Sequence, residues 1–360
     1  MPSFHTGTSG RVHRSPVKNL FRLIGWTLTV LILLAVTGWE TLAVYYSNLP
    51  EPLRLPGAIV VALVSLGTLL MVRPAGRSIS IFLCGFSIVI LWFLFIPPSN
   101  DRDWQPDVAR LSWAEIDGDR ITVHNIRKFD YRSETDYTPA YYDKQFDLSK
   151  LEGVDVVAVY WMGPDIAHVF LSFDFTSGDH LAISIEARKE KGEGYSTLKG
   201  FFRQYELYYV VADERDVIRL RTNYRHDPPE DVYVYRAHHG TIENGRRLFL
   251  SYMDRINALK ARPEFYNTLT TNCTTNIWLN TRVNPDHLPF SWKILLSGHI
   301  PEYLYETGCL DTSIPFPELE KRVHINTRAH AADAAADFSR RIRGELVKTS
   351  PAGTSGNSRN

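Results

Sequence analysis

One cysteine set among small polar residues is the part of the sequence best suited to chemistry. Cys273 lies in the run Thr-Thr-Asn-Cys-Thr-Thr at 270–275, and apolar residues follow it. We predict a helix that begins near Asn272, with the Asn272 side chain as its cap and Thr274 in its first turn. Unpaired amides and the positive end of the helix dipole favour a thiolate over a thiol there. The pattern predicts a cysteine nucleophile.

A thiolate nucleophile needs an imidazole base, and the base needs an orienting partner. Of the twelve histidines, His168 stands out because it begins a predicted strand and is followed by Val-Phe-Leu. The second strand of the same predicted hairpin offers two partners, Glu186 on its polar alternation and His180 at its start, and the choice between them stays open. We therefore predict catalytic roles for Cys273, His168 and Glu186, and supporting roles for Asn272, Thr274 and His180.

Each of these residues also has a structural alternative. A cysteine is often a small buried residue, and Cys273 and Cys309 are a possible disulfide pair in an oxidising compartment. His168 is alternatively a hydrogen-bonded residue at a strand start, and Glu186 an exposed strand carboxylate. The dense charges at 186–193 and 203–225 are typical of a solvated face, and the alternative for them is a site for anionic lipid headgroups.

Other chemistries lack their minimal sequence signatures. The chain has no Cys-x-x-Cys, no His-Glu-x-x-His, no glycine-rich phosphate loop and no Gly-x-Ser-x-Gly. Metal, nucleotide and serine-hydrolase sites are therefore disfavoured, and no cofactor is expected. The 40 Lys and Arg residues equal the 40 Asp and Glu residues in number, so the composition gives no argument for a nucleic-acid partner.

Three apolar stretches crowd the first hundred residues and must hold the rest of the chain at a membrane. A helix crosses the hydrocarbon core with about 20 apolar residues, and somewhat fewer are tolerated. We expect three transmembrane helices within residues 20–97, at 23–45, 57–72 and 79–96. The second stretch is short, and the alternative for it is a re-entrant or buried hairpin.

Basic residues set the predicted orientation, because Lys and Arg near span ends are retained in the cytoplasm. No acidic residue interrupts the basic residues before the first span, and two arginines fill the second connection. The residues in question are Arg11, Arg14, Lys18 and Arg22, then Arg73 and Arg77. Residues 1–19 are therefore expected to form a basic cytoplasmic tail, and three crossings place everything after Pro97 on the far side.

Residues 98–345 are long enough for a substantial core. Short β-branched or aromatic runs predict strands at 120–123, 154–161, 168–175, 180–186, 207–212 and 232–235. Helical spacing predicts helices at 246–261, from about 272, and at 328–348. This order indicates an α+β domain, with residues 99–147 as a bridging subdomain and 346–360 as a disordered tail.

With these elements in place, the chain resembles the Lnb-type periplasmic domain family, from about Asn100 to Arg343. The resemblance rests on the order and spacing of several segments: Asn-Asp-Arg-Asp-Trp at 100–104, Ala-His at 167–168, Ser-Ile-Glu-Ala-Arg at 184–188, Tyr-Glu at 205–206, Asp-Glu-Arg-Asp-Val-Ile at 213–218, Phe-Tyr-Asn at 265–267 and Thr-Asn-Cys-Thr-Thr at 271–275. It implies a circularly permuted papain-like fold, related to NlpC, in which the histidine strand precedes the cysteine helix.

The resemblance also implies an activity. Members of the Lnb group are associated with N-acylation of bacterial lipoproteins, in which a cysteine takes up an acyl chain as a thioester and passes it to an amine. By position, Cys273 would be the nucleophile, His168 the base and Glu186 the third member. We expect a multi-pass protein of the bacterial inner membrane, facing the periplasm, that works as a cysteine-dependent acyltransferase on lipid or lipoprotein substrates.

Two alternatives stay open. The same residues would hydrolyse an amide or ester if water replaced the amine, as in a periplasmic cysteine peptidase or amidase. A non-enzymatic envelope scaffold with a structural cysteine is the second alternative. The expected partners are membrane lipids, with lipoproteins or envelope peptides as further candidates, and no nucleic acid.

Overall fold

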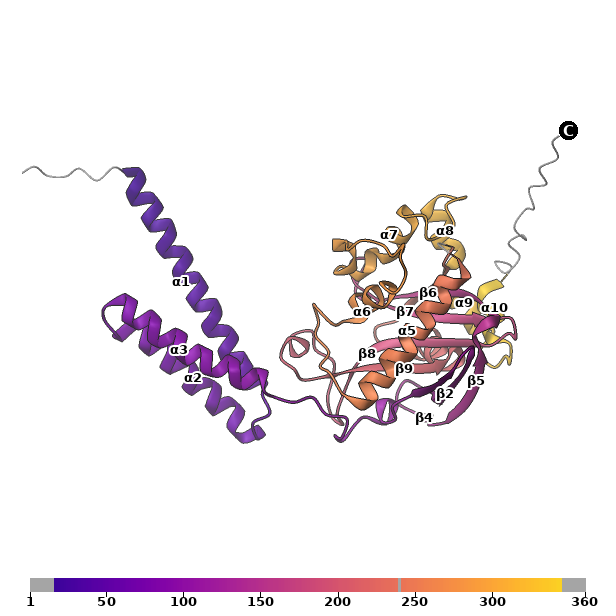
Figure 1. The fold of residues 1–360 in the computed structure, drawn as a ribbon, viewed down its shortest axis with the longest axis horizontal. Helices are drawn as coiled ribbons and strands as arrows, with labels where there is room; N and C mark the ends of the chain where they lie inside the picture. Colours follow the sequence, from indigo (N-terminus) through magenta and orange to yellow (C-terminus); the bar gives the residue numbers. More distant parts are fainter. Residues whose placement is uncertain (1–15, 239–240, 345–360) are drawn as a thin grey trace, which may run out of the picture. The chain divides into compact units, whose positions relative to one another are not determined.

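The computed structural model describes residues 16–238 and 241–344, and these form two compact units that meet in the sequence between Pro97 and Pro98 (Figure 1). Arg11 and Arg14 of the predicted cytoplasmic tail, and the predicted disordered tail 346–360, lie outside the described residues.

The first unit consists of three helices that are long and apolar enough to cross a membrane. They are α1 (Pro16–Tyr45), α2 (Glu51–Met71) and α3 (Ala75–Leu94). Helix α2 begins six residues earlier than the predicted span and contains Pro56. Helix α1 packs against both others, and Trp39 meets the rings of Phe86 and Phe93 on α3 edge to face.

The second unit is built on a mixed sheet with the strand order β1-β2-β9-β8-β7-β6-β10, to which β5 adds by pairing with β2. All these pairs are antiparallel except the parallel contact of β2 with β9. The strands are β1 (Trp113–Asp117), β2 (Arg120–Arg127), β5 (Tyr141–Asp147), β6 (Leu151–Tyr160), β7 (Ala167–Phe175), β8 (His180–Arg188), β9 (Glu206–Asp213) and β10 (Asp231–Arg236). A separate ribbon pairs β3 (Asp130–Tyr131) with β4 (Tyr137–Thr138).

The prediction of a bridging subdomain over 99–147 is wrong. Strands β1, β2 and β5 fall in this segment and extend the main sheet. Their apolar side chains, among them Ile121, Val123 and Phe146, are buried in the same core as the strands that follow. Strands from this segment therefore extend the core of the α+β domain predicted over residues 98–345.

Helices cover both faces of this sheet, because side chains alternate between its faces along each strand. Val169 and Ile183 point into one core, which α5 (Ile242–Ala261) and α6 (Cys273–Thr281) close; α5 runs across the sheet in Figure 1. Phe170 and Ala182 point into the other core, beside α4 (Glu214–Arg219) and the π-helical segment Leu220–Tyr224. The remaining helices are α7 (Ile300–Glu306), α8 (Phe316–Val323), α9 (Asn326–Ala331) and α10 (Phe338–Arg343).

The predicted single helix at 328–348 is also wrong, because the described part of this segment forms the two short helices α9 and α10. The break lets Phe338 and Ile342 enter the second core. It also brings the Arg343 guanidinium to within 2.6 Å of Asp155 and of Glu214. The α+β architecture agrees with the prediction, and the permuted papain-like fold stays a prediction.

Candidate functional site

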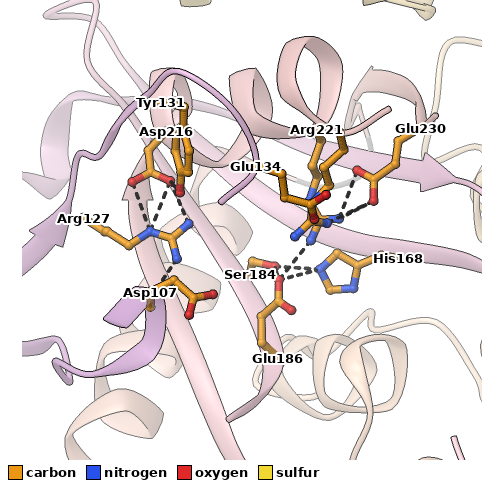
Figure 2. Close-up of polar contacts among 11 residues, drawn as sticks. Asp107, Arg127, Tyr131, Glu134, His168, Ser184, Glu186, Asp216, Arg221 and Glu230 are labelled. Carbon is orange, nitrogen blue, oxygen red and sulfur yellow. Dashed lines mark hydrogen bonds and ion pairs between the residues drawn. The ribbon is translucent and has the colours of Figure 1, made fainter. Parts of the chain in front are cut away.

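The site lies at one end of the β7–β8 hairpin. The two strands pair from Asp174 opposite His180 to Leu171 opposite Ile183. Further along, side chains bridge them: His168 Nε2 lies 2.7 Å from Ser184 Oγ and 3.2 Å from Glu186 Oε1, as Figure 2 shows. A histidine on one strand and a carboxylate on the other thus face each other across the hairpin, as the alternation of side chains along two antiparallel strands dictates.

The hydroxyl of Ser184 fixes the direction of these hydrogen bonds. Ser184 Oγ donates its one proton to Glu186 Oε1 at 2.8 Å, so it accepts from His168 Nε2–H. The Nε2 nitrogen therefore carries a proton. The other ring nitrogen, Nδ1, remains for the contact between His168 and the thiol of Cys273.

Cys273 is the first residue of α6, the position that the sequence predicts. Asn272 caps the helix, since its Oδ1 accepts from the Thr275 backbone N–H at 2.9 Å. The thiol is in hydrogen-bond contact with the His168 side chain and with the backbone N–H of Val169. Helix α6 packs on β7 and β8, and this packing brings the cysteine to the histidine strand.

The electrostatics favour an imidazolium–thiolate pair. Burial raises the pKa of the Cys273 thiol, but the hydrogen bond and charge of His168 and the N–H of Val169 outweigh it, so this pKa lies below its usual value. Burial lowers the pKa of His168, but the Glu186 charge and the hydrogen bond to Cys273 raise it to about 9. Burial also opposes ionisation of Glu186, whose pKa His168 and Arg221 hold well below its usual range.

A buried arginine supports the carboxylate. Arg221, in the π-helical segment, places Nη2 3.0 Å from Glu186 Oε1 and Nη1 3.3 Å from Glu230 Oε1. Arg225 Nη1 reaches the same Glu230 oxygen at 3.0 Å. Figure 2 shows this cluster beside His168, apart from the Arg127–Asp216–Tyr131 cluster. Sequence analysis missed Arg221, because we expected the charges of 203–225 on a solvated face; the interleaved Val217, Ile218 and Leu220 were the signal for burial.

The predicted supporting residues have other partners. The Asn272 amide donates to the carbonyl of Thr268 at 2.8 Å and its oxygen caps α6, so its side chain is engaged at both ends. The buried Thr274 hydroxyl donates to the Ile294 carbonyl at 2.6 Å. His180 lies at the turn end of the hairpin, where its Nε2 is 3.1 Å from Asp174. The structure therefore brings together Cys273, His168 and Glu186, and it places His180 elsewhere.

All three cysteines are free thiols, including Cys273 and the buried Cys309, so the alternative of a disulfide between these two does not apply. Within residues 16–238 and 241–344, no three His, Cys, Asp or Glu side chains are grouped so as to hold a metal ion.

Comparison with known proteins shows one similarity, within the second unit. Residues 137–298 match the family model of the Lnb N-terminal periplasmic domain. The matched segment contains His168, Ser184, Glu186, Arg221 and Cys273. No curated protein and no solved structure matches the chain. The protein thus contains a segment that matches this family model, and three helices that are long and apolar enough to cross a membrane precede that segment.

Proposed function

We propose that the protein is a membrane-anchored, periplasmic cysteine-dependent acyltransferase that acts on lipid or lipoprotein substrates through a thioester on Cys273. One observation carries the proposal: the thiol at the start of α6 meets a histidine whose far ring nitrogen is bonded to Ser184 and Glu186. A nucleophile, a base and an orienting carboxylate in this order are what acyl transfer through cysteine requires.

In the first half-reaction, the Cys273 thiolate attacks the ester carbonyl of an acyl donor and forms a carbon–sulfur bond. The oxyanion develops beside the first turn of α6, where unpaired backbone amides and the helix dipole stabilise negative charge. When the intermediate collapses, the carbon–oxygen bond breaks and the His168 imidazolium gives its proton to the departing alkoxide. Glu186 stabilises the imidazolium until that transfer.

In the second half-reaction, an amine attacks the thioester carbonyl and passes a proton to the neutral His168. The carbon–sulfur bond breaks, the amide leaves, and the imidazolium–thiolate pair is restored. Both proton transfers use Nδ1 of one histidine, because Nε2 stays bonded to Ser184 and Glu186.

The membrane location supports lipid as the acyl donor. The three apolar helices would keep the domain at a bilayer, and Arg73 with Arg77 in the short α2–α3 connection agrees with a cytoplasmic position for that connection. Three crossings would then put the domain in the periplasm, which agrees with the name of the family model that residues 137–298 match.

The test uses the full-length protein in phospholipid nanodiscs that contain an alkyne-tagged acyl phospholipid. We expect a hydroxylamine-sensitive acyl adduct on Cys273, which a lipopeptide with a free N-terminal amine discharges as an amide. Cys273→Ala should form no adduct, and Cys309→Ala, the matched control, should form it normally. Release of the adduct as free fatty acid in the absence of the amine would favour a cysteine hydrolase over an acyltransferase. Full activity in Cys273→Ala would contradict both of these functions.

A further inference from the structure

A cavity of about 600 Å³ lies between one face of the sheet and the helices α5 to α8. Aliphatic and aromatic side chains make up much of its wall: Val154, Leu171, Leu248, Ile277, Trp278 and Leu304. This volume falls in the range of about 300–1,000 Å³ that is usual for small-molecule sites. The proposed chemistry of Cys273 does not by itself account for an apolar space of this size.

Cys273 itself does not line the cavity, but residues next to it on two elements do. Val169 lines it, and the backbone N–H of the same residue contacts the Cys273 thiol. Thr274, the next residue along α6, also lines it, and so does Ile277, one helical turn after the cysteine. The cavity wall therefore includes neighbours of Cys273 on both β7 and α6.

We propose that the cavity receives the aliphatic chain of the acyl group while its carbonyl carbon is bonded to Cys273. This inference rests on the proposed acyl transfer and adds the place in the fold where the acyl chain is bound. Each methylene that moves from water into the cavity contributes favourably through the hydrophobic effect. The chain therefore holds the thioester in place and shields it from water until the amine arrives.

The position of the wall has a consequence for chain length. Leu304 on α7, and Leu319 and Val323 on α8, line the cavity, but α7 and α8 follow the segment 137–298 that matches the Lnb domain. The catalytic residues lie inside that segment. Selection of the chain length would thus depend in part on helices that follow the matched segment.

The first experiment is photolabelling of the full-length protein in nanodiscs with a diazirine-bearing hexadecanoic acid, followed by peptide mapping. We expect labels on the α5, α6 and α7 peptides, and also on α1 to α3, which serve as an internal reference for chains in the bilayer. The Cys273→Ala variant should keep the labels of α5 to α7, because chain binding needs no covalent bond. The proposed function is tested separately, by the formation of the hydroxylamine-sensitive acyl adduct on Cys273.

The second experiment fills the cavity. Leu304→Trp and Ile277→Trp should each reduce the labelling of α5 relative to α1 by about tenfold, and should shift adduct formation from hexadecanoyl toward octanoyl donors. Leu279→Trp on the exposed side of α6 is the matched control and should change neither. Thermal unfolding of each variant checks that it is folded.

Labels confined to α1–α3, or unchanged labelling and chain preference in both folded filling variants, would overturn the inference. If a hexadecanoyl adduct still formed on Cys273 in that case, the proposed function would stand without the cavity. Labels on α5 to α7 without any acyl adduct on Cys273 would support chain binding in the cavity and contradict the proposed acyl transfer.

Discussion

Arg221 donates to Glu186 Oε1 at 3.0 Å, and the same oxygen lies 3.2 Å from His168 Nε2. One carboxylate oxygen therefore accepts from both the Arg221 guanidinium and the His168 imidazolium. The Arg221 charge opposes protonation of His168, whereas the Glu186 charge favours it. The pKa of His168, about 9, is thus a balance between a buried arginine and the carboxylate that the arginine holds. Substitutions in this group should move the proton equilibrium of the base as well as the stability of the fold.

Replacing Arg221 with Met should destabilise the domain by about 3 kcal/mol, because it leaves buried carboxylates with fewer partners. It should also raise the pKa of His168 further, since the opposing positive charge is gone. Arg225→Met is the matched control. This arginine also contacts Glu230, but 28 % of its side chain is exposed. Its replacement should therefore destabilise the domain by less than Arg221→Met does. Urea midpoints give the stabilities, and equal losses in the two variants would contradict the assignment of Arg221 to the site.

Glu186→Gln should slow adduct formation by about a hundredfold or more, the usual contribution of an oriented general base. The amide removes the charge that raises the pKa of His168, so the alkaline limit of the rate should move to lower pH. Ser184→Ala should reduce the rate of adduct formation by less than about tenfold, because His168 keeps its direct contact with Glu186 at 3.2 Å. The measurement is the initial rate of adduct formation across pH. A larger loss in Ser184→Ala than in Glu186→Gln would reverse the two roles.

The hairpin and the cysteine helix could be predicted from the sequence, because their determinants are local. Alternating apolar residues, the Thr-Ser-Gly-Asp turn at 176–179 and a capping Asn before Cys273 each act over a few residues. The structure has β7, β8 and α6 close to the predicted positions, with Asn272 as the cap. The placement of His168 and Glu186 on one end of the hairpin followed from these elements.

The buried charges could not be predicted in the same way. Glu214, Asp216, Arg219 and Arg221 lie in one short charged segment, and all four are buried. Their partners are distant in the sequence: Arg127 for Asp216 and Arg343 for Glu214. Periodicity and composition give no information on such pairs, since burial of a charge depends on the fold bringing its partner to it.

The protonation of the thiol should follow His168. Alkylation of Cys273 by iodoacetamide should rise with pH through an inflection below the usual thiol value, because the imidazolium lowers this pKa. In His168→Ala the burial of the sulfur is no longer offset, so the inflection should move to higher pH. Cys309 is the internal control: burial raises its pKa, so it should react more slowly than Cys273 at neutral pH. Peptide mass spectrometry follows both thiols, and identical profiles for them would rule out the ion pair.

The final prediction concerns acid stability and the ion pairs that fasten α10 to the sheet. Arg343 holds Glu214 and Asp155 at 2.6 Å each. Burial opposes ionisation of Glu214, but the charge and hydrogen bonds of Arg343 lower its pKa from 4.5 to about 2. A carboxylate with a depressed pKa in the folded state stabilises that state above pH 4.5, and this contribution is lost as the pH falls toward 2. The shift of this pKa corresponds to about 3 kcal/mol.

Arg343→Met should therefore be about 3 kcal/mol less stable than the parent protein at pH 7, and the difference should shrink as the pH falls from 4.5 toward 2, where Glu214 becomes protonated in both proteins. Arg340→Met is the matched control in the same helix. The Arg340 side chain is 76 % exposed, so this substitution should lower the free energy of unfolding by less than about 1 kcal/mol at every pH. Urea titrations followed by tryptophan fluorescence measure both variants. A difference for Arg343→Met that is the same at pH 7 and near pH 2 would show that lost packing, and not the ion pair with Glu214, accounts for it.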